Sequence, residues 1–352
     1  MNADVRYIYS RMGDSLSREI YHDRLRYSAT RDLCHIEHMV ETTVRSNPQW
    51  ERLCTRLKKT AMQSRMYLFG AGKWGNILFR ETSRSVPWTA AIDSAPAGKT
   101  VGDLPIVPLQ ALVECDCREM SIVISSYKNG HEMRKLLQKT GIPQNRIIDA
   151  GTVIHQLTEG AIYFDLEQLK PMESGEFFVD AGCFDGMTTQ AFFRWCQGKG
   201  YAYCFEPDKG NAAVVRKNLV EWLNRYELAE KALWSKMADL CIDARGDCAS
   251  SVRENGGLDG NDRAAAVALD EYIGKKRVTY IKMDVEGAEK EVLEGAKHTI
   301  TAQHPRLAVS IYHKAADIRL LPGLILHYYP GYRFYLRHYS FSDYDTVLYA
   351  VP

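Results

Sequence analysis

The sequence predicts an α/β protein with two Rossmann-like domains behind a helical N-terminal segment. Three observations lead to this prediction. Short apolar runs of strand length alternate with amphipathic stretches of helix length along most of the chain. Two of these runs lead into glycine loops, at Gly70 and at Gly182. The chain has 352 residues, which is more than one hydrophobic core usually organises, so two domains are expected.

The composition places the chain among ordinary globular proteins. Hydrophobic residues make up 45% of the chain and charged residues 25%. The formal net charge is +1, so the chain lacks the strongly positive electrostatic field that nucleic-acid binding requires. No apolar run approaches the roughly 20 residues of a membrane helix, and the first residues lack the apolar core of a signal peptide. We therefore expect a cytoplasmic protein with no membrane span and no nucleic-acid partner.

The nine cysteines are scattered along the chain, and their number is odd. The closest pair, Cys115 and Cys117, is separated by one residue, which is too tight for an ordinary zinc knuckle. Others, such as Cys204 and Cys241, lie inside apolar runs. This pattern favours reduced thiols over a disulfide framework.

Residues 1–62 are expected to be helical. Apolar residues recur there at helical spacing: Ile20, Leu25, Leu33, Ile36, Met39, Val40 and Val44. Cys34, His35 and His38 lie on adjacent turns, but no fourth ligand is visible, so we interpret them as a polar helix face rather than a zinc site. These helices are also candidates for a homodimer interface or for a cap on the first α/β domain.

Residues 63–150 are expected to form a small parallel α/β domain. Strand-length apolar runs occupy 66–69, 89–92, 104–108, 121–124 and 146–148, and helix-length segments separate them. Residues 151–173 are expected to be a connecting helix and loop, in which Pro171 punctuates the chain.

The pattern restarts at residue 174 and gives a second α/β domain that runs to residue 352. A helix is expected over 288–296. Strands are expected over 177–180, 201–205, 227–232, 264–269, 278–283, 307–312, 332–335 and 346–350. The 264–269 segment looks like a hairpin strand, and the last two segments alternate like an antiparallel pair.

The glycine loop Asp180–Gly186 follows a strand and opens a helix. Glycines let the backbone approach a ligand closely and point free amides toward it. Glu206 ends the next strand about 20 residues later, where an acid can bind the hydroxyls of a ribose. The pair predicts a site for an adenosine with a free ribose, carried either by a dinucleotide or by S-adenosylmethionine.

A set of short motifs makes a family resemblance specific. The motifs occur in this order: Asp180–Gly186, Phe205–Asp208, Ala232–Ser235, Val267–Asp270, Ile281–Glu289 and Asp345–Tyr349. Over residues 174–352 the chain resembles the FkbM family of S-adenosylmethionine-dependent methyltransferases, most specifically in Lys-x-Asp-Val-Glu-Gly-x-Glu at 282–289. The resemblance implies a class I methyltransferase fold, a mostly parallel sheet with an antiparallel C-terminal hairpin. It also implies O-methylation of a small molecule, for which we expect a sugar, a nucleotide-sugar or a glycan.

The resemblance also implies roles for individual residues. Asp180, Gly182 and Gly186 would surround the methionine end of the cofactor, Glu206 would hold the ribose, and Leu233 would flank the adenine. The full set of cofactor contacts that it implies is Asp180, Ala181, Gly182, Phe184, Gly186, Thr188, Glu206, Pro207, Ala232, Leu233 and Asp284. The pair Cys183–Phe184 departs from the small or polar residues usual in such loops, which would reshape the pocket.

Methyl transfer to a hydroxyl gains from a base, and two residues are candidates. Asp284 follows an apolar strand, at the sheet edge where open α/β folds bind ligands. His313 follows the next strand. Glu286 and Lys282 are candidates for positioning the acceptor or the cofactor. Alternatively, Lys282 pairs with Asp284 and Glu286 caps the following helix.

Two further hypotheses remain open at the catalytic end of the domain and in the first domain. Asp284, Asp270 and His313 would hold magnesium if they converged. Gly70, Gly72 and Gly75 form a second glycine loop, with Asp93 at the next strand end. That loop and the Gly102–Ile106 pattern are similar to small nucleotide-binding folds attached to sugar-modifying enzymes. The first domain would then bind a nucleotide or nucleotide-sugar, or serve as a scaffold.

Two other function classes compete with methyl transfer. The first is an NAD(P)-dependent sugar oxidoreductase or epimerase that uses the loop at residues 70–75. Its usual Tyr-x-x-x-Lys has one formal match, Tyr272 to Lys276, which Gly274 interrupts, so we interpret the match as chance. The second is a glycan-binding module without catalysis, which loss of the cofactor residues would favour, and those residues are present.

Overall fold

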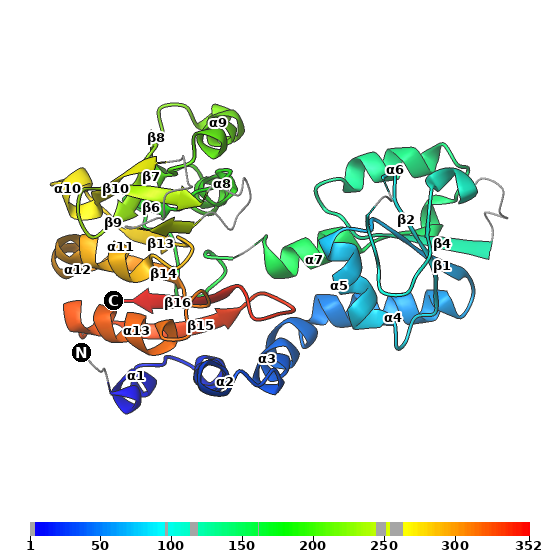
Figure 1. Cartoon of the computed structure of the whole chain (residues 1–352), viewed down its shortest axis with the longest axis horizontal. Helices are drawn as coiled ribbons and strands as arrows, with labels where there is room; N and C mark the ends of the chain where they lie inside the picture. The colour runs from blue at the N-terminus through cyan, green and yellow to red at the C-terminus, as the bar shows by residue number, and fades with distance from the viewer. Residues whose placement is uncertain (1–3, 96–97, 113–118, 161, 244–250, 254–262) are drawn as a thin grey trace. The chain divides into compact units, whose positions relative to one another are not determined.

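The computed structural model describes residues 4–95, 98–112, 119–160, 162–243, 251–253 and 263–352. The chain divides into two compact units, one formed by Met1–Met39 with Ala161–Pro352 and the other by Val40–Gly160 (Figure 1). The expected boundaries were different: they gave residues 1–62 a segment of their own and made 151–173 a linker. In the structure the first helices belong to the same compact unit as the C-terminal domain.

The unit Val40–Gly160 contains a five-stranded parallel sheet in the order β3-β2-β1-β4-β5, the strand order of a doubly wound fold. The strands are β1 (Arg65–Phe69), β2 (Trp88–Ile92), β3 (Ile106–Val107), β4 (Met120–Ile124) and β5 (Ile147–Asp149). The helices are α4 (Pro48–Ala61), α5 (Lys73–Thr82), α6 (Gly130–Gln138) and α7 (Ala150–Thr158). Strands β1 and β4 are almost wholly buried, as their unbroken apolar sequences predict. All five expected strands are confirmed.

The other unit is built on a seven-stranded sheet in the order β15-β16-β14-β13-β6-β7-β8. The strands are β6 (Glu176–Ala181), β7 (Gly200–Phe205), β8 (Tyr226–Ala229), β13 (Tyr280–Met283), β14 (Arg306–Ser310), β15 (Arg333–His338) and β16 (Thr346–Val351). Strand β16 lies antiparallel between β14 and β15, and β6, β7, β8, β13 and β14 run parallel. The expected antiparallel C-terminal pair is therefore confirmed.

Helices follow most strands of this sheet (Figure 1). They are α8 (Met187–Trp195), α9 (Lys209–Asn218), α10 (Leu269–Ile273), α11 (Glu289–Gly295), α12 (Lys297–Gln303) and α13 (Asp317–Tyr328). Helix α8 packs on β6 and β7, while α11 packs on α12 and α13. Asp208 caps α9 by accepting a hydrogen bond from the N–H of Asn211 at 2.7 Å, which explains why the helix begins directly after Glu206 and Pro207.

The segment after β8 differs from the sequence prediction. The expected single strand over 227–232 is two strands, because β9 (Ala232–Trp234) leaves the main sheet and joins a second one. This four-stranded sheet has the order β11-β10-β12-β9, with β10 (Ala238–Asp243), β11 (Ser251–Arg253) and β12 (Arg263–Ala268). Strand β12 pairs antiparallel with β10, which agrees with a hairpin strand at 264–269. Strands β10 and β11 lack strong alternation of apolar residues and were not predicted.

The N-terminal helices cover the edge of the main sheet at β15. They are α1 (Val5–Ser10), α2 (Ser15–Thr30) and α3 (Cys34–Val40). Gly13 donates its N–H to the carbonyl of Phe334 at 2.7 Å, and Phe334 donates to the carbonyl of Arg11 at 2.9 Å. Ser17, on α2, accepts a hydrogen bond from the N–H of Leu336 at 3.0 Å. An exposed edge strand is a template for pairing with other chains, and this segment removes that exposure.

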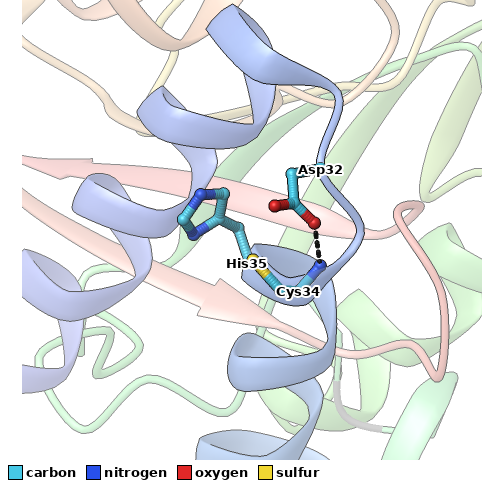
Figure 2. A group of neighbouring side chains, drawn as sticks. All are labelled: Asp32, Cys34 and His35. Atoms are coloured by element: carbon cyan, nitrogen blue, oxygen red, sulfur yellow. Dashed lines mark hydrogen bonds between the residues drawn. The ribbon is translucent and has the colours of Figure 1, made fainter.

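The turn between α2 and α3 carries the polar residues that the sequence singled out. Asp32, Cys34 and His35 offer side-chain atoms within 4.8 Å of one another (Figure 2). His38 is directed elsewhere: its Nδ1 lies 2.6 Å from Oδ2 of Asp23. Asp32 and Cys34 are exposed, and Asp32 accepts a hydrogen bond from the N–H of Cys34 at 3.0 Å. His35 approaches the same carboxylate, with its Nδ1 3.7 Å from Oδ1 of Asp23, so both histidines of the expected polar helix face lie against Asp23.

Two broader expectations can be compared with the structure. Among the described residues no helix is both long enough and apolar enough to cross a membrane. Within the same residues, Cys34, Cys54, Cys183, Cys196, Cys204 and Cys241 are free thiols. Cys115 and Cys117 lie outside the described residues.

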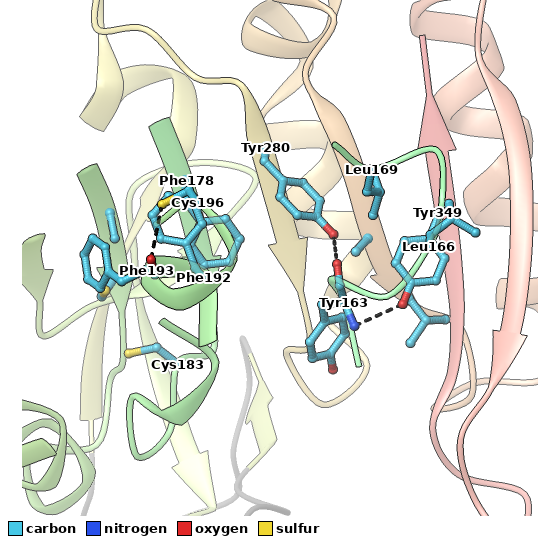
Figure 3. Packing of buried hydrophobic residues seen from close by; sticks show 14 of the residues in the cluster. Tyr163, Leu166, Leu169, Phe178, Cys183, Phe192, Phe193, Cys196, Tyr280 and Tyr349 are labelled. Carbon is cyan, nitrogen blue, oxygen red and sulfur yellow. Dashed lines mark hydrogen bonds between the residues drawn. The ribbon is translucent and has the colours of Figure 1, made fainter. Parts of the chain in front are cut away.

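The core under the main sheet is rich in aromatic side chains (Figure 3). Phe178 on β6 stacks on Phe192 of α8 with ring centroids 4.6 Å apart, and Phe193 stacks on Trp222 at 4.5 Å. Burying each of these rings contributes favourably to the free energy of folding, and the contacts between rings add about 0.5–1.5 kcal/mol per pair. This packing fixes β6 and α8, and thus the loop between them.

His338, at the end of β15, is a buried titratable group that the fold keeps neutral. Its side chain is 3% exposed, and its Nδ1 lies 2.9 Å from Oγ1 of Thr346. Burial, together with the positive charge of Arg24, lowers the pKa of His338 to about 3. Because the unfolded chain binds this proton near pH 6.5 and the folded chain does not, stability is lost as the pH falls below about 6.5.

We expect His338→Gln to remove part of the acid sensitivity of the fold. Between pH 6.5 and pH 5 the free energy of unfolding of the wild type should fall faster than that of the variant, by up to about 1.4 kcal/mol per pH unit. Urea unfolding followed by circular dichroism at several pH values measures the difference. Parallel pH dependences for the two proteins would contradict this assignment.

Candidate functional site

The loop Asp180–Gly186 joins β6 to α8 through three left-handed backbone positions. The φ angles are +73° at Gly182, +49° at Phe184 and +78° at Gly186. A Cβ on Gly182 would lie 2.1 Å from the carbonyl oxygen of Asp284, so only glycine permits this approach of the two loops. The N–H groups of Gly182 and Cys183 both donate to the carbonyl of Phe205 at 3.1 Å. The expectation of free amides at these two positions is thus wrong, and Gly182 serves close packing instead.

A buried ion pair fixes the start of this loop. Asp180 and Lys282 are partners on the adjacent strands β6 and β13, and Nζ of Lys282 lies 3.1 Å from Oδ1 of Asp180. Thr189 donates its hydroxyl to the other carboxylate oxygen of Asp180 at 2.7 Å. Lys282 also donates to the carbonyl of Gly182 at 2.6 Å. Burial disfavours the charged amine, but the negative charges of Asp180 and Asp284 outweigh it and raise the pKa of Lys282. The partner of Lys282 is therefore Asp180, and not Asp284 as the alternative reading had it.

Glu206 connects the end of β7 to the loop. Its Oε2 accepts a hydrogen bond from the N–H of Phe184 at 2.9 Å, and its Oε1 accepts from the N–H of Asp208 at 3.0 Å. Only 6% of Glu206 is exposed, and burial raises the pKa of its carboxyl group. A carboxylate oxygen accepts two hydrogen bonds, so Oε2 keeps a lone pair for a further donor such as a ribose hydroxyl.

Asp284 lies directly beyond β13, beside Gly182. Tyr163 donates its hydroxyl to Oδ2 of Asp284 at 3.0 Å, and Tyr312 donates to Oδ1 at 3.2 Å. The side chain of Asp284 is 25% exposed. Burial alone would raise the pKa of Asp284, but the charges of Lys282 and His313 outweigh it and lower the pKa. Asp284 is therefore ionised near neutral pH and able to accept a hydrogen bond or a proton.

Tyr163 is held in place by the core below the site. Tyr163 donates its N–H to the hydroxyl of Tyr349 at 3.0 Å, and its carbonyl accepts a hydrogen bond from the hydroxyl of Tyr280 (Figure 3). These bonds fix the backbone from which the Tyr163 hydroxyl reaches Asp284. This contact could not be predicted from the sequence, because Tyr163 lies outside every motif.

His313 lies among three carboxylates. Its Nε2 is 3.3 Å from Oε2 of Glu286 and 3.7 Å from Oδ1 of Asp284, and its Nδ1 is 2.9 Å from Oε1 of Glu289. Burial disfavours the imidazolium, but contacts with Glu286 and Glu289 outweigh it and raise the pKa of His313 to about 10. An imidazole that already carries its proton cannot accept another, so the geometry disfavours His313 as a general base.

The segment that carries Glu286 has an unusual backbone. The φ angle is +53° at Glu286 and +94° at Gly287. A non-glycine residue in this region costs roughly 1–2 kcal/mol. The start of α11 is bonded by Glu289, whose Oε1 accepts a hydrogen bond from the N–H of Val285 at 3.0 Å. Glu289, to which the sequence analysis assigned no role, therefore bonds the turn that precedes α11.

Other predicted residues have simpler surroundings. Ala181 ends β6, Thr188 lies half-buried on α8, and Pro207 follows Glu206. Ala232 and Leu233 are buried in β9. Asp270 is not part of the Asp284 cluster: it accepts hydrogen bonds from Thr299 and His298 at the start of α12. The hypothetical magnesium set of Asp284, Asp270 and His313 is therefore wrong. Glu286, rather than Asp270, lies beside Asp284 and His313.

The first glycine loop has a different bonding pattern. Asp93 accepts a hydrogen bond from the N–H of Ala71 at 3.0 Å, and its other oxygen binds Lys99 at 2.8 Å. A Cβ on Gly75 would lie 1.9 Å from the carbonyl oxygen of Gly70, whereas one on Gly72 would meet open space. Asp93 thus bonds its own loop as Glu206 does, but it also pairs with Lys99, which competes with a ribose hydroxyl for the second carboxylate oxygen.

Tyr272 and Lys276 do not form a catalytic pair. Tyr272 donates its hydroxyl to Glu227, and Nζ of Lys276 lies 3.1 Å from the other oxygen of the same carboxylate. Both side chains are engaged at β8, so the formal Tyr-x-x-x-Lys match has a local structural role.

We expect Gly182→Ala to destabilise the C-terminal domain by at least about 2 kcal/mol, because it adds a steric clash to an unfavourable φ angle. Gly274→Ala is the matched control, since Gly274 also has a positive φ of +57° but a Cβ there would meet no atom within 4 Å. Denaturant unfolding of both variants measures the difference, and equal losses would contradict a tight contact between Gly182 and Asp284.

The region that holds this site is similar to a known protein family. Residues 180–342 match the family model described as the methyltransferase FkbM domain. A 2-O-methyltransferase, NoeI of Sinorhizobium fredii, is 30% identical over 165 residues, which are 41% of this chain and 65% of that protein. The match thus spans less than two thirds of the curated relative.

Solved structures were also compared. A methyltransferase FkbM from Methylobacillus flagellatus is 19% identical, with a TM-score of 0.48, over 87% of this chain and 94% of that one. A fibrillarin from Aeropyrum pernix, solved with bound S-adenosyl-L-methionine, is 11% identical with a TM-score of 0.35 and covers 55% of this chain and 73% of its own. Residues 180–342 of this chain, which hold the loop, Glu206 and Asp284, are thus similar to the methyltransferase domain of the FkbM family.

Proposed function

We propose that the chain is an S-adenosylmethionine-dependent O-methyltransferase that acts on a hydroxyl of a sugar, a nucleotide-sugar or a glycan. One observation carries the proposal. The Asp180–Gly186 loop, the buried acid Glu206 and the carboxylate of Asp284 lie together at the carboxyl ends of the parallel strands, in a domain similar to that of the FkbM family. That edge is where open α/β sheets bind their ligands.

The residues present fit S-adenosylmethionine. Glu206 offers a carboxylate oxygen with a remaining lone pair to the ribose, and the glycine loop lies between Glu206 and Asp284. The cofactor, when bound, supplies a methyl group activated by its sulfonium. Buried Asp180 and Lys282 do not need to touch it, because their contacts hold the loop itself.

Asp284 is the residue that we assign to the acceptor hydroxyl. It is ionised, partly exposed and oriented by the hydroxyls of Tyr163 and Tyr312. A carboxylate within hydrogen-bond reach aligns the acceptor oxygen and takes up its proton as methyl transfer proceeds. His313 carries its own proton and holds Asp284 and Glu286 in place.

The nature of the acceptor rests on resemblance. The curated relative is a 2-O-methyltransferase by name, which supports oxygen as the methylated atom. For the first α/β domain, the bonding of Asp93 to Ala71 and Lys99 supports a scaffold role over nucleotide binding. Protection of that domain against proteolysis by a nucleotide or nucleotide-sugar would reverse this preference.

We expect S-adenosylmethionine to bind with micromolar affinity and Glu206→Ala to weaken it at least about tenfold, since the ribose loses a charge-assisted hydrogen bond. Asp93→Asn, which alters the corresponding acid of the first glycine loop, should bind as the wild type does. Isothermal calorimetry measures both, with NAD and NADP as parallel ligands. Binding of NAD alone, lost on Asp93→Asn, would contradict the proposal and favour an oxidoreductase.

We expect Asp284→Asn to lower turnover by about 10²- to 10⁴-fold, because the amide can no longer accept the proton. The substitution preserves shape, so the melting temperature and the affinity for S-adenosylmethionine should stay close to wild type. Release of S-adenosylhomocysteine in the presence of a sugar or nucleotide-sugar acceptor found by screening is the assay. Turnover near that of the wild type would remove Asp284 from the mechanism.

A further inference from the structure

We propose that Asp284, Glu286 and His313 bind a divalent metal ion, with Mn²⁺ as the best match, beside the reacting centre. The inference rests on the proposed function and extends it, because the ion would hold the acceptor hydroxyl. It is carried by the arrangement of three side chains from two loops, the segment after β13 and the segment after β14.

The distances suit a single ion. Asp284, Glu286 and His313 each offer a ligand atom, and these atoms all lie within 4.8 Å of one another. Ligands that each lie about 2.1 Å from a metal are about 3.0–3.4 Å apart at octahedral or tetrahedral angles. Nε2 of His313 is 3.3 Å from Glu286 and 3.7 Å from Asp284, so small side-chain rotations close the set.

His313 provides an independent observation. Its side chain is 9% exposed, and within the described residues neither ring nitrogen makes a hydrogen bond of good geometry. Nε2 is directed between the two carboxylates without bonding either one. Nδ1 lies 2.9 Å from Oε1 of Glu289, and a carboxylate is one of the partners that orient metal-binding histidines through their second nitrogen.

The local charge also favours a cation. Asp284, Glu286 and Glu289 surround His313, the buried amine of Lys282 is paired with Asp180, and the exposed Lys314 lies beside Gly287. Carboxylates packed this closely repel one another unless positive charge lies between them. A bound divalent ion compensates them more fully than the single charge of an imidazolium.

The backbone of the Asp-Val-Glu-Gly segment is consistent with a built site. Glu286 has a φ of +53°, and this left-handed conformation turns its side chain back toward His313. Strained positions of this kind cluster at ligand-binding and active sites, where the surrounding structure over-determines them. Glu289 keeps the turn in place through the N–H of Val285.

The ligand chemistry selects the kind of ion. Carboxylate oxygens suit Mg²⁺, Ca²⁺ and Mn²⁺, whereas imidazole suits transition metals, and Mn²⁺ accepts both. Three protein ligands leave coordination positions for an acceptor hydroxyl. Asp284 binds the ion through one carboxylate oxygen and keeps the other for the proton of the acceptor hydroxyl, so Asp284→Asn is expected to impair both functions.

The transfer step balances in this arrangement. The ion would lower the pKa of the bound acceptor hydroxyl, whose proton passes to the second carboxylate oxygen of Asp284. The acceptor oxygen attacks the methyl carbon, the new O–C bond forms and the C–S bond breaks. The electron pair of the C–S bond remains on sulfur, so the sulfur of the departing S-adenosylhomocysteine is uncharged.

The test is Mn²⁺ binding by the full chain after treatment with EDTA and gel filtration, with free Mn²⁺ measured by electron paramagnetic resonance. We expect the wild type to bind one ion per chain. Glu286→Gln and His313→Gln should each weaken binding at least about tenfold. Glu294→Gln is the matched control, because Glu294 lies on α11, is exposed and forms an ion pair with Lys290.

Thermal unfolding of each variant and calorimetry with S-adenosylmethionine on the same samples separate the two proposals. A wild type that binds no Mn²⁺, or folded Glu286→Gln and His313→Gln proteins that bind it as the wild type does, would overturn the metal site. Mn²⁺ binding without S-adenosylmethionine binding would leave the metal site in place and contradict the proposed function.

Discussion

The buried contact of Lys282 with Asp180 is the constraint on which the rest of the site depends. It joins β13 to β6 at the point where both strands end, and the same amine binds the carbonyl of Gly182. Removing one member of such a pair leaves an uncompensated buried charge, at a cost of about 3–5 kcal/mol. The glycine loop and the segment after β13 are therefore one unit, and Gly182 touches Asp284 because this pair holds the two together.

The second constraint is electrostatic. The residues after β13 bring Asp284, Glu286 and Glu289 around one imidazole, and folding must compensate these charges. Without a metal the protonated His313 does so, which explains the elevated pKa of this residue. The same arrangement decides between the two candidate bases. His313, whose ordinary pKa suits a base, is already protonated, so Asp284 is the candidate that can accept a proton.

The fold and the main residues of the site were predictable because their signals are local. Apolar runs that end at Asp180, Glu206 and Asp284 mark strands of one sheet, and parallel strands bring their carboxyl ends to one edge. Contacts between distant segments were not predictable. Tyr163 reaches Asp284 across 121 residues of sequence, and α2 covers β15 across more than 300. Glu289 belongs to the most specific motif, but its contacts with Val285 and His313 depend on how the segments after β13 and β14 fold.

The measurement closest to the central claim is hydrogen exchange of the backbone with and without S-adenosylmethionine. If the cofactor binds between the Asp180–Gly186 loop and Glu206, amides near Phe184 and Asp208 exchange more slowly in its presence, while those of residues 70–75 are unchanged. Protection confined to residues 70–75, with none near Phe184 and Asp208, would contradict the account and move the nucleotide site to the first domain.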